Sequence, residues 1–246
     1  MSRCKIRLSG VLFTVCWLAG CPMQPRPAAA PAQPVAGAPA VAAHLGRPYD
    51  IVPERSLLTV RVYRGGTLAS AGHNHVIASH ALSGTIYVPA DLLESSFAVR
   101  IPASELTVDE PALRAAAGAD FPPDVSESAR AATQRNMLGS ALLDAAEFPD
   151  LVLEAERLES GPASSPAEVL AHIRTEVRGQ VRSITLPVRY ELHGSELTVS
   201  ADGPLTQSAL GLTPFTALLG ALTVQDDMQV SVHLVARAAG GGSGPR

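Results

Sequence analysis

Alternating apolar and polar residues run through most of the chain after residue 57. The clearest segments cover residues 58–63, 82–88, 97–101, 169–178, 184–193 and 228–237. A period of two places one set of side chains in the core and the other in solvent, which is typical of antiparallel strands. Weaker segments near 68–77, 148–158 and 195–201 bring the expected strands to about eight or nine, a number that favours a closed barrel because closure removes exposed edges. The pattern predicts an all-β fold.

Two segments interrupt the alternation. Residues 124–139 have helix character, with Asp124 or Ser126 as the N-cap and Gly139 as the stop, so we expect a short helical insertion. Residues 208–222 are apolar without a clean period. Such a segment either plugs the core or lies over an apolar cavity, and the pattern leaves both readings open.

The N-terminus has the layout of a secretory signal. Three basic residues precede the short apolar run 11–17. That run is well short of the roughly 20 residues that a spanning helix needs. The following Leu18-Ala19-Gly20-Cys21 resembles a bacterial lipobox, which predicts a signal over 1–20 and lipidation of Cys21. The alternative is an ordinary cleaved signal with a chance cysteine.

Composition narrows the function further. After residue 20, Cys21 is the only cysteine, so we expect no disulfide in the domain. The same part holds 16 arginines, no lysine and 23 acidic residues, a net charge of −7. The absence of lysine excludes a P-loop lysine and a Schiff-base lysine. The negative charge, with no basic stripe, argues against nucleic acid as a partner.

Residues 22–46 are mostly alanine and proline and read as a tether between Cys21 and the domain. We therefore expect a signal over 1–20, the lipidated cysteine and tether over 21–46, a barrel over 47–238 and a flexible tail over 239–246. Pro22 follows Cys21, and the aspartate that commonly holds such lipoproteins at the inner membrane is absent. We expect a lipid anchor on the outer membrane, facing the periplasm, in preference to the inner membrane.

The segment Gly72-His73-Asn74-His75 is the one constellation that suggests chemistry. On a strand, His73 and His75 would project to the same face, at a spacing that suits chelation of one metal ion. Two histidines fill only half of a tetrahedral zinc site. The other readings are polar residues at the mouth of a barrel or hydrogen-bond donors to the head group of a ligand. No catalytic serine elbow or phosphate loop accompanies them, so no cofactor and no catalytic residue are expected.

The order of elements is similar to that of the YceI family of bacterial exported proteins. The most specific piece is Leu143-Asp144-x-x-x-Phe148-Pro149 before a strand, and the similarity extends over about residues 48–237. Further matching pieces are Tyr49–Ser56, Leu82–Ile86, Phe97–Pro102, Val177–Val181 and Ile184–Val188.

The resemblance implies an extended antiparallel barrel of lipocalin type whose members hold a polyisoprenoid chain. We therefore expect non-enzymatic binding, storage or transport of such a lipid in the cell envelope. His73, His75 and Phe215 are the candidate ligand contacts. Two alternatives stay open: a metal-dependent envelope enzyme centred on His73 and His75, and a structural barrel with a filled core. The sequence does not fix the oligomeric state, and a dimer stays open.

Overall fold

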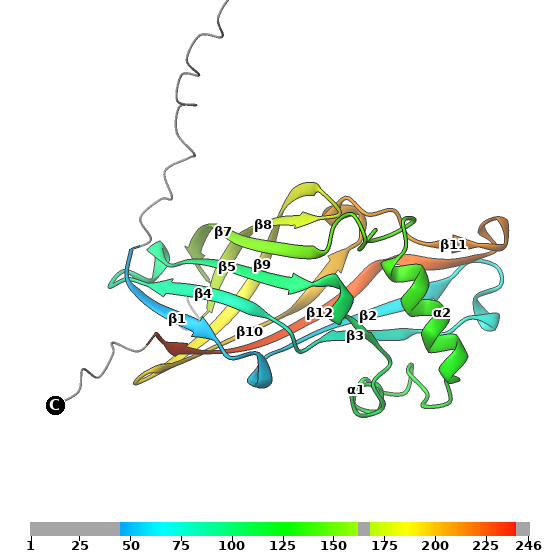
Figure 1. Cartoon of the computed structure of the whole chain (residues 1–246), viewed down its shortest axis with the longest axis horizontal. Coiled ribbons are helices and arrows are strands. Elements are labelled where there is room, and N and C mark those ends of the chain that lie inside the picture. The colour runs from blue at the N-terminus through cyan, green and yellow to red at the C-terminus, as the bar shows by residue number, and fades with distance from the viewer. Residues whose placement is uncertain (1–44, 162–167, 240–246) are drawn as a thin grey trace, which may run out of the picture. The chain divides into compact units, whose positions relative to one another are not determined.

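The computed structural model describes residues 45–161 and 168–239 (Figure 1). Long strands dominate, joined by short 3-10 turns and two helices. The strands are β1 (Arg47–Ile51), β2 (Leu57–Gly65), β3 (His75–Ser79), β4 (Ser83–Val88), β5 (Ser96–Pro102), β6 (Thr107–Val108), β7 (Asp150–Ser160), β8 (Glu168–Val177), β9 (Gln180–His193), β10 (Glu196–Thr206), β11 (Thr216–Ala217) and β12 (Leu222–Ala238). The helices are α1 (Pro111–Ala116) and α2 (Glu127–Leu138).

Eight antiparallel strands close into a barrel, as the alternation predicts. The order around the ring is β1-β4-β5-β7-β8-β9-β10-β12, and β12 returns to β1 through the pairs Tyr49↔Ala238 and Ile51↔Ala236. In β8 every second residue is buried, from Val169 to Val177. The barrel prediction is confirmed. The first strand, β1, begins at Arg47, and the last strand, β12, ends at Ala238.

Three further strands extend the sheet beyond the ring. β2 follows β1 along β12, β3 pairs with β2, and β6 pairs with β3, so that β2, β3 and β6 extend the wall toward α2. Ser56 stabilises the break between β1 and β2: its hydroxyl donates to Val52 O (2.8 Å) and accepts from Val235 N (3.1 Å). Helix α2 contacts β6 at this end. There the side-chain amide of Gln134 donates to Leu106 O (3.1 Å).

The helical insertion follows the prediction closely. The Ser126 hydroxyl accepts from Ala129 N (3.2 Å) as the N-cap of α2, and Gly139 is the C-cap. Within the part of the chain that the structure describes, no helix combines the length and the apolar composition that a bilayer crossing requires.

The phenylalanine-proline segment has a clear structural role. Asp144 adopts a positive φ of 49°, and Phe148 N donates back to Asp144 O (2.8 Å). The Phe148 ring then covers Gly179, where an added Cβ would lie 2.7 Å from the ring. Gly179 (φ +64°) belongs to the two-residue β8–β9 turn, so only glycine fits here without strain.

One expected strand begins later than the sequence pattern indicated. The segment near 68–77 contains a 3-10 turn over Ala69–Ala71, and β3 starts only at His75. A nearby close approach explains the turn, because Leu68 N donates to Ala221 O (2.8 Å) and pulls the chain toward the start of β12. The predicted signal and Cys21 lie outside the described residues, as do almost all of the predicted tether and tail.

Candidate ligand-binding cavity

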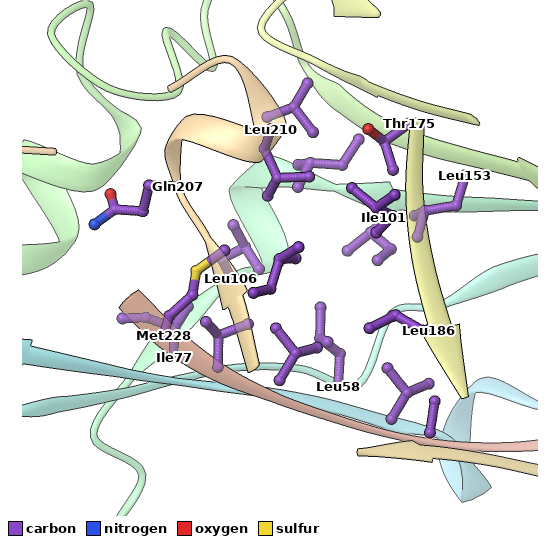
Figure 2. A pocket seen from close by; sticks show the side chains of 18 of the residues that line it. Leu58, Ile77, Ile101, Leu106, Leu153, Thr175, Leu186, Gln207, Leu210 and Met228 are labelled. Atoms are coloured by element: carbon purple, nitrogen blue, oxygen red, sulfur yellow. The ribbon is translucent and has the colours of Figure 1, made fainter. Parts of the chain in front are cut away.

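The barrel encloses an elongated cavity of about 570 Å³. Inward side chains of the barrel strands line it, and nearly all of these are aliphatic, since each strand turns its apolar set inward. Figure 2 shows part of the lining. The labelled apolar residues are Leu58, Ile77, Ile101, Leu106, Leu153, Leu186, Leu210 and Met228. The structure therefore has a hollow interior in place of the filled core that the sequence left open.

The two polar residues labelled in Figure 2 are already hydrogen-bonded to the wall. The Thr175 hydroxyl donates to Arg182 O (3.1 Å), and the Gln207 side-chain amide donates to Gln225 O (2.7 Å). Both side chains are buried. With these donors satisfied by the backbone, the middle of the cavity offers an apolar surface to a ligand.

The cavity opens toward the end of the barrel that carries α2. The solvent-exposed members of its lining gather there: Arg64, Ala71, His73 and Asn136. At the opposite end, Leu192 is the exposed member. We call the α2 end the mouth. No acidic residue belongs to the lining of the cavity, and its basic side chains, Arg64, His73 and His75, lie at the mouth.

The three candidate ligand contacts all lie on the wall of the cavity. His73 and His75 are neighbours, with ring centroids 6.2 Å apart in an edge-on arrangement. Phe215 comes from the segment before β11. The apolar segment 208–222 thus lies over a cavity: Leu210, Leu212, Phe215 and Leu222 line it.

His75 is held from both sides of its ring. Its Nδ1 lies 2.7 Å from Asp109 Oδ2, and its Nε2 lies 3.2 Å from the hydroxyl of Thr133 on α2. An ionised Asp109 accepts from Nδ1–H, and Nε2 lies within hydrogen-bonding distance of the Thr133 hydroxyl. Both nitrogens are then engaged, so His75 orients α2 against β3 and is not free to bind a metal ion.

Behind His75 lies a buried ion pair. Arg114 Nη1 donates to Asp109 Oδ1 (2.6 Å) and to Asn74 O (2.7 Å), and Val76 N also donates to Asp109 (2.9 Å). Burial opposes ionisation of Asp109, but the hydrogen bonds from His75, Val76 and Arg114 outweigh it, so the pKa of Asp109 lies below its ordinary value.

These partners could not be found from local pattern. Asp109, Arg114 and Thr133 are 34, 39 and 58 residues away from His75, and none of them stands in a motif. Only the fold brings them together. Across residues 45–161 and 168–239, no group of three or more His, Cys, Asp or Glu side chains is placed to hold a metal ion.

A closed antiparallel barrel around an apolar cavity with one polar mouth defines the lipocalin-like class of β-barrels. Within that class the chain belongs to the YceI family: the model of the YceI-like domain matches residues 49–236. No curated protein sequence matches the chain significantly.

The similar solved structures are distant in sequence. BcnA of Burkholderia cenocepacia is 16% identical with a TM-score of 0.55, over 76% of this chain and 99% of BcnA. A polyisoprenoid-binding domain from Saccharophagus degradans, implicated in plant cell wall breakdown, is 12% identical with a TM-score of 0.49, over 78% and 98%. The YceI protein of Campylobacter jejuni is 11% identical with a TM-score of 0.45, over 65% and 82%. The likeness to BcnA agrees with the barrel fold.

Proposed function

We propose that the domain binds one long apolar lipid of polyisoprenoid type inside the barrel, and stores or carries it without chemical change. The observation that supports this proposal most directly is the hollow, almost wholly aliphatic interior of about 570 Å³. Membership of the YceI family supports the proposal, because the sequence resemblance implies such a ligand.

Burial of the ligand supplies a free energy that grows with the length of its chain. Each methylene removed from water contributes about 0.8 kcal/mol. About ten of them contribute about 8 kcal/mol, which corresponds to a micromolar Kd before the cost of association is subtracted. A long chain therefore needs few polar contacts, in agreement with the few that the wall offers.

The test is lipid extraction from the purified full chain, followed by mass spectrometry. We expect one prenyl lipid per protein. Ala171 lies on β8 with its side chain on the cavity wall, so Ala171→Phe should occupy ligand space and reduce the bound lipid at least about tenfold. Leu170→Phe, one residue away on the outward face, is the matched control and should retain the lipid.

Circular dichroism of both variants shows whether the barrel is intact. Wild-type protein without any extractable lipid would contradict the proposal. So would a folded Ala171→Phe variant that keeps all of its lipid.

The cellular setting is a separate part of the proposal. We propose that Cys21 is lipidated and holds the chain at the outer membrane, facing the periplasm, on the tether over 22–46. The lipobox-like sequence and Pro22 support this. Labelled palmitate should enter the wild-type chain and not a Cys21→Ala variant; equal labelling of the two would contradict lipidation.

A further inference from the structure

Two loops form one rim of the mouth. The first covers residues 65–74, between β2 and β3, and the second covers residues 211–224, around β11; we call them the rim loops. They are joined by the pair Gly65↔Thr223 and by the hydrogen bond from Leu68 N to Ala221 O (2.8 Å). Both contribute to the cavity wall, through His73 in the first loop and through Phe215 and Leu222 in the second. Figure 1 shows them at the end opposite β1.

The rim loops expose leucines to water. Leu218 is 64% exposed and Leu219 is fully exposed, and Leu68 on the other loop is exposed as well. Leu218 and Leu219 both adopt positive φ angles, 51° and 55°, followed by Gly220 at 88°. L-residues avoid this left-handed region, which glycine or asparagine would fill with less strain. Residues 218–220, the tip of the second rim loop, therefore combine backbone strain with exposed leucine side chains. Contact with water stabilises neither feature.

The charge of the rim fits an anionic surface. The rim loops contain no acidic residue, although acidic residues outnumber arginines after residue 20. Their ionisable side chain is His73, and Arg64 directly precedes the first loop. The Arg64 guanidinium donates to Gly72 O (2.7 Å), and among the described residues it has no carboxylate partner. A cation and apolar side chains on one edge are the features that place a segment in the interface of a bilayer.

We propose that the rim loops dock the mouth of the cavity on an anionic phospholipid bilayer, with Leu218 and Leu219 inserted among the acyl chains. The cavity then opens into the hydrocarbon region, so that a long lipid crosses between bilayer and barrel without passing through water. The transfer of lipid in this inference rests on the proposed function, but the docking itself can be measured without any ligand.

Tryptophan fluorescence can report this contact at a single residue. The chain has one tryptophan, Trp17, within the predicted signal. In a full chain that carries Trp17→Phe, Leu219→Trp places the sole tryptophan at the tip. The matched control is Leu93→Trp, also at an exposed leucine in a loop, on the β4–β5 connection beside the start of β1. Both proteins are mixed with vesicles of brominated phosphatidylcholine and phosphatidylglycerol.

We expect the tryptophan at position 219 to shift its emission to the blue and to be quenched by the brominated chains, while the tryptophan at position 93 shows neither change. Adding Leu218→Ser to the Leu219→Trp protein should weaken the inserted state about tenfold. Quenching at both positions, or at neither, would overturn the proposal. Lipid extraction from the same samples separates the two proposals: bound lipid without quenching refutes docking alone, and quenching without bound lipid refutes the binding function alone.

Discussion

Along its middle the cavity touches aliphatic side chains and a few polar groups that are bonded to the wall. At its mouth it meets Arg64, His73 and His75, with the buried Asp109–Arg114 pair behind them. The middle can hold any apolar chain that fits, because burial of methylenes is not directional. The mouth fixes polar groups in defined positions, which is what orientation of a ligand requires. Under the proposed function, the middle of the cavity would supply affinity and the mouth would supply orientation.

The largest expected effect comes from breaking the ion pair behind the mouth. Arg114→Ala leaves the buried carboxylate of Asp109 without its cation, and we expect the free energy of unfolding to fall by about 3–5 kcal/mol. Arg174→Ala removes an exposed pair with Glu154 on the barrel wall and should cost about 0–1 kcal/mol. Urea unfolding of both variants measures the difference. Equal losses would show that the mouth does not depend on its buried charges.

A smaller effect separates the two histidines. His75→Phe keeps the ring shape but removes both hydrogen bonds, which leaves Asp109 and Thr133 each short of one partner, and should cost about 1–3 kcal/mol. His73→Phe, at an exposed ring, should change stability by no more than about 0.5 kcal/mol. Urea unfolding of the two histidine variants measures both losses of stability. A larger loss for His73→Phe would reverse the roles that the structure gives to this pair.

The smallest expected effect is the change of the free energy of unfolding with pH. The folded pKa of Asp109 lies below its unfolded value, so its contribution to stability is fully present above about pH 4 and is lost as the pH falls through the folded pKa. Urea midpoints measured from neutral to acidic pH should therefore decline more steeply in wild type than in Asp109→Asn. Parallel curves for the two proteins would contradict a stabilising ionised Asp109.

The inward face of the barrel wall was predictable from sequence, and the hydrogen-bond partners at the mouth were not. The two-residue period of β8 identifies the inward face directly, since a strand alternates its side chains whatever its partners are. Ser126 and Gly139 likewise marked the ends of α2. At the mouth, the backbone turn over Ala69–Ala71 breaks the alternation, and the partners of His75 come from distant segments. Propensity and period carry no information on such contacts.

The segment 208–222 is a second region whose arrangement could not be predicted from the sequence. Its composition left a core plug and a cover over a cavity as alternatives. The structure divides it: Leu210, Leu212, Phe215 and Leu222 face the cavity, while Leu218 and Leu219 face solvent. The division depends on three successive positive φ angles at residues 218–220, and two of these belong to leucines, a residue type that gives no warning of such a turn.

The length of β12 separates two ends of the barrel, which we call the β1 pole and the β11 pole. The 17 residues of β12 span roughly 55 Å at about 3.3 Å each, with β1 paired at its C-terminal end and β11 at its N-terminal end. The chain enters the barrel at the β1 pole, whereas the cavity opens at the β11 pole. An extended segment of 25 residues, the length of 22–46, reaches roughly 80 Å. Under the proposed anchoring at Cys21, the mouth lies a full strand length away from the point where the chain enters the barrel, so deletions in 22–46 should cut off access to the anchoring membrane well before they disturb the fold.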